Sequence, residues 1–222
     1  MVNVACTPLP PGVLDKWHFA PAQCGQMMVL PDGCRDLIMR FSPQGEPSCM
    51  VSSLDASSYA VAYKPGDVFS GYRFRPGVRI DSQGLLNALS GLNDCAPARV
   101  QNILGDFVLL DAALSEALAA ISNTAGIGKA GRALGVSERT LQRVVMQGTG
   151  QTPSFWKGLV RARRCARALL VQEQALADIA AAQGYADQAH MNREFQRWFG
   201  LTPAMFRQQP ALVHAVMQPG YD

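Results

Sequence analysis

The sequence predicts an α+β chain of two domains: a small antiparallel β-rich N-terminal domain, then an all-α domain with two helix-turn-helix motifs joined by a linker helix. The first observation is a change of pattern along the chain: short apolar runs between turn formers are followed by alanine-rich helical periodicity. The second is a repeat. Leu-Gln-Arg at 141–143 with Gly-Gln-Thr-Pro at 150–153 recurs about fifty residues later as Met-Asn-Arg at 191–193 with Gly-Leu-Thr-Pro at 200–203. One supersecondary unit is therefore expected twice.

The first domain is expected over residues 1–123. Turn formers at 31–33, 42–45, 64–67 and 76–77 separate the predicted strands, which are 36–41, 48–51, 59–63 and 72–75. Such spacing suggests a small antiparallel sheet or a reduced barrel. Helical patterns at 85–92 and 107–121 then predict a helical connector over about 85–123. The alternating aromatic and basic segment 72–77 could hold an anionic effector, or be a half-exposed strand with its arginines in solvent.

The helical domain is expected over residues 124–209, followed by a C-terminal tail over 210–222. Its charge differs from that of the rest. Residues 124–209 hold 12 Lys and Arg against 5 Asp and Glu, which is +7, whereas the remainder holds 8 against 12, which is −4. A basic module beside a mildly acidic one is expected when only one of them faces a polyanion.

The first repeat unit begins with an apolar stripe formed by Ile127, Ala130 and Leu134. Its second helix is predicted to begin after Ser137, a favourable N-cap residue. Three polar side chains of this helix share its exposed face: Arg139, Gln142 and Arg143. Arginine suits guanine and glutamine suits adenine in the major groove. The alternative is an ordinary solvated helix surface.

The second unit repeats the pattern with a turn at Gly184 and an N-cap at Asp187. Met191, Phe195, Trp198 and Phe199 form its predicted buried stripe. The outward residues are again of base-reading type: Gln188, Ala189, Asn192, Arg193 and Gln196, with His190 at the margin. His190 could donate to DNA or merely cap a neighbouring helix.

The linker helix between the units is predicted over 153–171, with Thr152 as N-cap and Pro153 at its first position. Nineteen residues at about 1.5 Å each span roughly 28 Å. This length approaches the ~34 Å between successive major-groove faces on one side of B-DNA. The basic residues of this helix are expected to contact phosphates: Lys157, Arg161, Arg163 and Arg164, with Arg167 nearby, joined by Ser137 and Gln196 from the two units.

Other classes of function find little support in the sequence. Three histidines, at 18, 190 and 214, are too few for a histidine-rich metal centre, and we expect neither a cofactor nor an enzyme. The six cysteines are scattered and are expected to be reduced thiols. The glycine pattern at 126–131 resembles a dinucleotide fingerprint but lacks the preceding strand. With no apolar run of about 18 residues and no signal-peptide pattern, we expect a cytoplasmic protein without a membrane partner.

The motifs of residues 125–209 resemble the AraC/XylS family of bacterial transcription regulators. The resemblance rests on Gly-Val-Ser-Glu-Arg-Thr-Leu-Gln-Arg at 135–143, Gly-Tyr-Ala-Asp-Gln-Ala-His-Met at 184–191, and Phe-Gly-Leu-Thr-Pro at 199–203. It implies a seven-helix DNA-binding domain whose base-reading positions are Arg139, Gln142, Arg143, Gln188, Ala189, His190, Asn192 and Arg193. Ala189 departs from the long polar residue often found there. Residues 31–38 and 74–77 resemble a short N-terminal domain of unassigned role in one branch of the family.

The predicted function is sequence-specific binding of double-stranded DNA by a transcription regulator, with the N-terminal domain modulating it. A small-molecule effector, RNA polymerase and a second copy of the chain are further possible partners. Two alternatives stay open. One is a DNA repair or modifying protein that delivers a reactive cysteine, Cys34, and the other is a thiol redox sensor that controls DNA binding.

Overall fold

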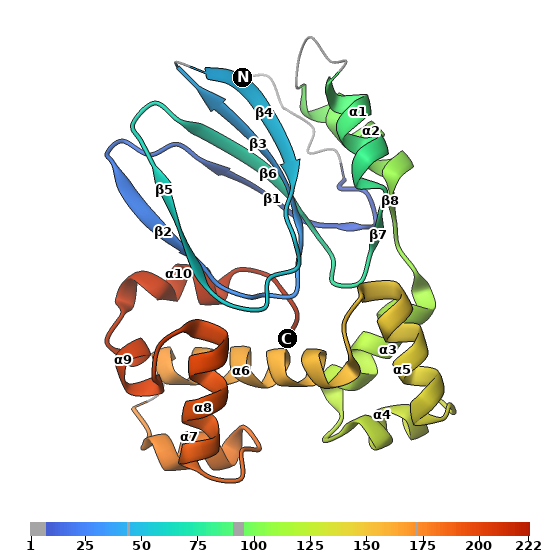
Figure 1. The fold of residues 1–222 in the computed structure, drawn as a ribbon, viewed down its shortest axis with the longest axis vertical. Coiled ribbons are helices and arrows are strands. Elements are labelled where there is room, and N and C mark those ends of the chain that lie inside the picture. The colour runs from blue at the N-terminus through green and yellow to red at the C-terminus, as the bar shows by residue number, and fades with distance from the viewer. Residues whose placement is uncertain (1–7, 44, 91–95, 172) are drawn as a thin grey trace.

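The computed structural model describes residues 8–43, 45–90, 96–171 and 173–222 (Figure 1). Its β-rich part contains an antiparallel four-stranded sheet in the order β1-β6-β3-β4. The strands are β1 (Val13–Phe19), β3 (Asp36–Ser42), β4 (Gly45–Val51) and β6 (Val68–Phe74). A separate antiparallel pair lies opposite this sheet, formed by β2 (Gly25–Val29) and β5 (Tyr59–Tyr63). The expected small antiparallel sheet is therefore present.

One face of the sheet carries the core of the N-terminal part. Leu37 and Met39 alternate inward along β3, and Tyr72 and Phe74 do the same along β6. Two helices cover this face, α1 (Ser82–Ser90) and α2 (Pro97–Phe107). A short pair, β7 (Arg79–Ile80) with β8 (Val108–Leu109), closes the end of this layer. At the centre of the sheet Gly71 lets the indole of Trp17 cross the backbone, because a Cβ there would lie 2.3 Å from the ring.

The helical part is built around one long central helix, α6 (Pro153–Val171). Figure 1 shows α4 (Ile127–Ala133) and α5 (Glu138–Thr149) at one end of α6, and α7 (Leu176–Ala182) and α8 (Gln188–Phe199) at the other. Buried residues lie all round α6, from Phe155 and Leu159 to Ala162, Cys165 and Leu169. A helix that is buried around most of its circumference is a core helix rather than a surface linker.

The helix α3 (Ala112–Asn123) joins this helical core although the connector was predicted to belong to the first domain. Leu114, Leu118 and Ile121 are buried in the same cluster as residues of α5 and α6. The helix starts later than the predicted 107–121 pattern, since residues 108–109 pair as a strand and Asp111 caps the helix by accepting from the backbone N of Leu114 at 3.1 Å.

Residues 210–222 are a packed segment rather than an extended tail. The helix α9 (Pro203–Arg207) is followed by η1 (Pro210–Leu212) and α10 (Val213–Met217), and the chain then returns to α6. Tyr221 is buried edge-on against Trp156, with the ring centroids 4.9 Å apart, and its hydroxyl donates to the carbonyl of Leu118 at 2.7 Å. Its backbone N donates to the carbonyl of Asp32 at 2.7 Å. This segment therefore ties the N-terminal part to α3 and α6.

A second link joins the N-terminal part to the second repeat unit. The backbone N and the hydroxyl of Ser58, in the loop before β5, both donate to the carbonyl of Trp198 near the end of α8, at 3.0 and 3.1 Å. The loop residue Leu54 packs against the helical core as well. Among the described residues, no helix is both long and apolar enough to cross a membrane.

Candidate nucleic-acid interface

The first unit is a helix-turn-helix whose ends follow from local chemistry. Gly135 makes the turn between α4 and α5 with a φ of +67°, and Gly150 ends α5 in the left-handed conformation with a φ of +69°. The hydroxyl of Ser137 accepts from the backbone N of Thr140 at 3.1 Å and so caps α5. Leu141 and Val145 are buried beneath the helix.

The predicted reading face of α5 is open to solvent. Arg139, Gln142 and Arg143 are all exposed, and they stand opposite the buried residues of the same helix. Two long guanidinium groups and one amide on a single helical face offer hydrogen-bond donors and an acceptor of the kinds that suit base edges in a major groove. Thr140, by contrast, lies at the margin toward α3, half-buried.

The second unit has the same construction. Gly184 turns the chain between α7 and α8 with a φ of +75°, Gly200 ends α8 with a φ of +70°, and the carboxylate of Asp187 accepts from the backbone N of His190 at 2.6 Å. Met191, Phe195, Trp198 and Phe199 form the buried face. The predicted repeat of one supersecondary unit is therefore confirmed by the helix ends as well as by the helices.

The reading face of α8 is less open than that of α5. Gln188, Ala189, Arg193 and Gln196 are exposed, whereas His190 and Asn192 are half-buried. The Nδ1 of His190 accepts from the backbone N of Ala186 at 3.4 Å, and its Nε2 lies 3.6 Å from Glu194 Oε2. His190 thus contacts its own unit at both ring nitrogens, and only Gln188, Arg193 and Gln196 extend fully into solvent as long polar side chains.

The basic residues of α6 lie in intramolecular contacts, which differs from the expected phosphate stripe. Lys157 donates to the carbonyls of Ile121, Ser122 and Thr124 at the end of α3, and Arg164 donates to the carbonyl of Ser122 at 3.2 Å and its hydroxyl at 2.9 Å. These cations satisfy carbonyls that the helix leaves without partners and face its negative end. Burial lowers the pKa of Lys157.

The remaining three arginines of α6 are also engaged. Arg163 is only 2% exposed, and its guanidinium contacts Asp222 Oδ1 at 3.0 Å and the carbonyl of Gln218 at 3.0 Å. Arg167 pairs with Asp222 Oδ2 at 2.8 Å, and Arg161 pairs with Glu194. Because α6 lies at the centre of the helical part, its charged side chains have partners on α3, on α8 and near the end of the chain.

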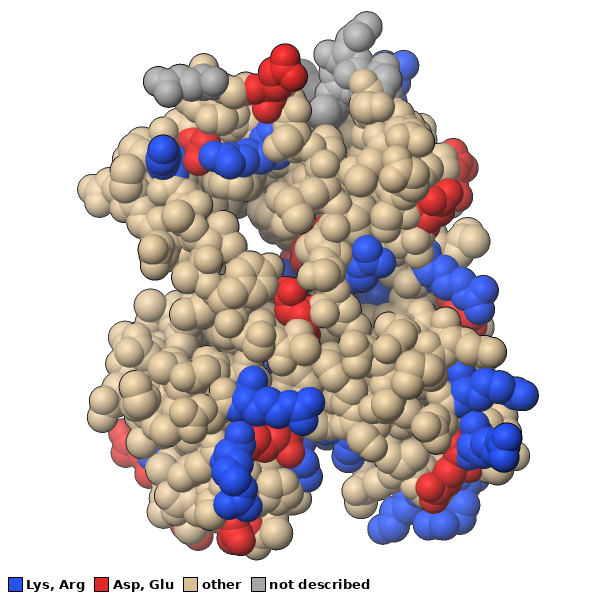
Figure 2. All heavy atoms as spheres, viewed as in Figure 1, with Lys and Arg blue, Asp and Glu red and all other residues tan. Residues whose placement is uncertain are grey.

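Exposed cations occur instead on the two repeat units. Figure 2 shows Lys and Arg gathered over the α4–α5 end of the molecule and over the α7–α8 end. Lys129 and Arg132 on α4, which the sequence reasoning did not single out, are exposed. The first helix of a helix-turn-helix commonly crosses the DNA backbone, and that placement could have identified both residues from the sequence.

Among the described cysteines, Cys34 is not placed as a reactive thiol, and none belongs to a metal-binding cluster. Cys34 is 4% exposed, and burial, together with the neighbouring Asp32 carboxylate, raises the pKa of its thiol well above the ordinary value. Such a thiol is protonated at neutral pH, which opposes the alternative of a reactive Cys34. Cys24 and Cys49 are exposed and Cys165 is buried, while Cys6 and Cys95 lie outside the described residues. Within the described ranges no cluster of potential metal ligands occurs.

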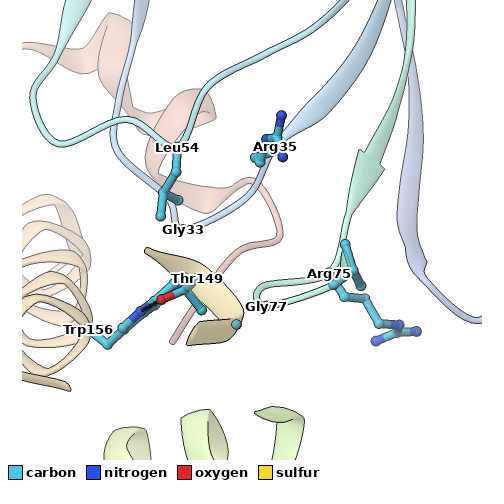
Figure 3. Close-up of a pocket in the computed structure, with 9 residues that line it drawn as sticks. Gly33, Arg35, Leu54, Arg75, Gly77, Thr149 and Trp156 are labelled. Carbon is cyan, nitrogen blue, oxygen red and sulfur yellow. Dashed lines mark hydrogen bonds between the residues drawn. The ribbon is translucent and has the colours of Figure 1, made fainter. Parts of the chain in front are cut away.

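A small cavity of about 70 Å³ lies where the N-terminal part meets α5 and α6 (Figure 3). Leu54 and Gly33 lie on one side, Thr149 and Trp156 on the other, and the guanidinium of Arg75 points away. The arginines of the 72–77 segment are engaged elsewhere, because Arg73 pairs with Asp32 and Asp36 and Arg75 donates to the carbonyl of Pro11.

Comparison with known proteins agrees with this geometry. Residues 131–209 match a family described as a helix-turn-helix domain. Similar solved structures include a transcriptional regulator with an AraC-type DNA-binding domain from Chromobacterium violaceum, 27% identical with a TM-score of 0.40, which covers 48% of this chain and 94% of that chain. Another is the C-terminal domain of the response regulator AraT from Geobacillus stearothermophilus, 24% identical with a TM-score of 0.41, covering 45% and 87%. No curated protein matches the chain at a significant level.

A third similar structure spans both halves: ToxT from Vibrio cholerae, 8% identical with a TM-score of 0.42, covers 87% of this chain and 97% of that chain. The domain match and the two capped helix-turn-helix units define a DNA-binding transcription regulator. Within residues 131–209 the helix-turn-helix resemblance seen in the sequence is confirmed.

Proposed function

We propose that the protein reads a specific site on double-stranded DNA by placing α5 and α8 in two adjacent segments of the major groove. The observation that carries the proposal is the pair of capped helices with exposed polar faces, held at opposite ends of one 19-residue helix. A helix of that length spans about 28 Å, close to one turn of B-DNA at ~34 Å. Two readers on one chain thereby cover a continuous site.

Base reading is assigned to the outward side chains of the two helices. Arg139, Gln142 and Arg143 read the segment facing α5, and Gln188 and Arg193 read the segment facing α8, with His190 and Asn192 at its edge. Arginine can bond guanine through two donors, and glutamine can bond adenine through its amide. Because α5 has two exposed arginines on its face, its half of the site should carry the stronger guanine preference.

Phosphate contacts are assigned to exposed groups that flank these faces. Ser137 and Gln196 keep the role expected from the sequence, and Lys129 and Arg132 on α4 are added to them. Such contacts fix the register of the protein on the duplex without selecting sequence. Lys157, Arg163 and Arg164 leave this group, since their charges are used inside the fold.

The N-terminal part is proposed to modulate DNA binding through its two links to the helical part. Ser58 bonds to α8 itself, and Tyr221 connects the loop at Asp32 to α6. A change in the β-rich part, whether from an effector or from pairing with a second copy, would reach the reading helices by these links. Contact with RNA polymerase is part of the same proposal for a transcription regulator.

Selection from a randomised duplex library tests this function directly. We expect enrichment of one motif with two adjacent halves, bound with a steep dependence on salt. In that motif Arg143→Ala should relax preference in one half and Arg193→Ala in the other, each losing about 1–3 kcal/mol of discrimination. Lys64→Ala, on an exposed residue of the N-terminal part, is the matched control and should bind as the parent does. Failure to enrich any motif, together with binding insensitive to salt, would refute the proposal.

A further inference from the structure

The linker helix holds the second reading helix through a two-point ion pair. Arg161 of α6 donates from Nε to Glu194 Oε1 at 3.2 Å and from Nη2 to Glu194 Oε2. Both side chains are largely enclosed, with 25% and 14% of their surfaces exposed. A planar guanidinium bound to a carboxylate at two points fixes orientation as well as distance. The pair therefore restrains how α8 is rotated relative to α6.

The same guanidinium also contacts the turn of the second unit. Its Cζ lies 4.7 Å from the centroid of the Tyr185 ring, a cation–π distance, and Tyr185 is the buried residue directly after the turn glycine. His190, in the first turn of α8, packs edge-on against Tyr185 at 5.4 Å and approaches Glu194 as well. Arg161 thus contacts both the turn and the reading helix that follows it.

The charge of Glu194 explains why this contact matters for DNA. Glu194 lies on the reading helix beside Arg193, and a carboxylate without a partner there would repel the phosphates that Arg193 must approach. Arg161 balances that charge inside the protein. The guanidinium of Arg161 is thus directed at its own domain, with Nε and Nη2 on Glu194 and its face on Tyr185.

We propose that Arg161 and Glu194 are positioning residues for DNA reading: they set the orientation of α8 on α6, and Arg161 does not contact the DNA backbone. This inference rests on the proposed function. On either side of Arg161 along the linker helix, Lys157 and Arg164 hold α3 in a similar way through its terminal carbonyls. The basic residues of α6 therefore shape the domain that binds DNA instead of attracting the DNA.

Salt dependence distinguishes the two roles. Affinity falls as salt rises, and loss of one phosphate contact reduces the steepness of log affinity against log salt by about 0.9. Below, a lowered slope means this reduced steepness. Arg161→Met keeps the aliphatic stem, and we expect it to reduce specific affinity about tenfold, a coupling of ordinary size, with the slope unchanged. The reduced affinity of Arg161→Met should appear as weaker discrimination between bases in the half of the motif that Arg193 reads. The control Arg132→Ala, on an exposed residue of α4, should lower the slope by about one.

A second variant tests whether the affinity lost in Arg161→Met comes from the unpaired charge of Glu194. In Arg161→Met/Glu194→Met two apolar side chains replace the pair, so we expect it to recover most of the affinity that the single variant loses. A slope lowered by about one in Arg161→Met, or no recovery in the double variant, would overturn the inference. Absence of any enriched motif with the parent protein would instead overturn the proposed function, so the two failures are distinguishable.

Discussion

At the residue scale, the role of each arginine depends on what lies opposite it in space. Arg139 and Arg163 both lie on helices of the same domain. Arg139 is exposed, whereas Arg163 is buried, with 2% of its side chain exposed, and pairs with Asp222. The sequence could predict that Arg139 faces outward, because its helix has a clear apolar side. It could not predict the partner of Arg163, which lies 59 residues further along the chain. The spacing of apolar residues along a helix gives no information on a partner that lies far away in the sequence.

Thiol labelling at neutral pH gives a prediction at this scale. Cys24 and Cys49 should react rapidly with a maleimide, whereas Cys34 and Cys165 should react only on unfolding. Burial raises the pKa of Cys165 to about 12, so its thiolate is scarce at pH 7.5 and should grow only as the pH approaches that value. Mass spectrometry of the labelled peptides measures the order, and denatured protein serves as the control. Fast labelling of Cys34 in the folded protein would restore the reactive-cysteine hypothesis.

At the element scale, helices with local end signals could be predicted closely, and elements that depend on distant partners could not. The linker helix occupies Pro153–Val171, as expected, because Thr152 and Pro153 mark its start. Strand β1 was missed: Asp15, Lys16 and His18 interrupt its apolar pattern, and pairing with β6 supplies what the sequence does not show. The helix α2 lies within the predicted helical connector, but the sequence did not mark its bounds, since it packs on α1 and the sheet.

The caps of the reading helices provide the prediction at this scale. Ser137→Ala removes the hydroxyl that accepts from the backbone N of Thr140, so we expect a loss of about 1 kcal/mol in the free energy of unfolding. Ser154→Ala, at an exposed position near the start of α6, should change it by less than about 0.5 kcal/mol. Urea denaturation followed by circular dichroism measures both. Equal effects of the two substitutions would mean that the cap does not stabilise α5.

At the scale of the whole molecule, residues 218–222 bind the two halves together. Gly33, with a φ of +79°, allows this contact because a Cβ there would lie 2.7 Å from Tyr221 Cβ and 3.0 Å from the Trp156 ring. From the sequence, residues 210–222 were expected to be a C-terminal tail. Its structure comes entirely from what it packs against: Arg163, Arg167, Trp156 and the loop at Asp32.

Replacement of Tyr221 tests this link. Tyr221→Ala leaves a cavity against Trp156 and should lower the free energy of unfolding by roughly 3 kcal/mol. Tyr221→Phe loses only the hydrogen bond to Leu118 and should cost about 1 kcal/mol. Limited proteolysis should then cut the alanine variant between the β-rich and helical parts faster than the phenylalanine variant. If the alanine and phenylalanine variants unfold and are cut alike, the ring does not hold the halves together.

The unbroken course of α6 has a consequence for how such a protein can change its DNA site. Each residue of an α-helix advances by about 1.5 Å and turns by about 100°. One residue inserted between Pro153 and Val171 would therefore turn the second reader away from the groove while hardly moving it outward. Three or four residues, close to one full turn, would restore its facing and shift it by about 5 Å. The distance between the two halves of the site is consequently adjustable only in steps of a helical turn.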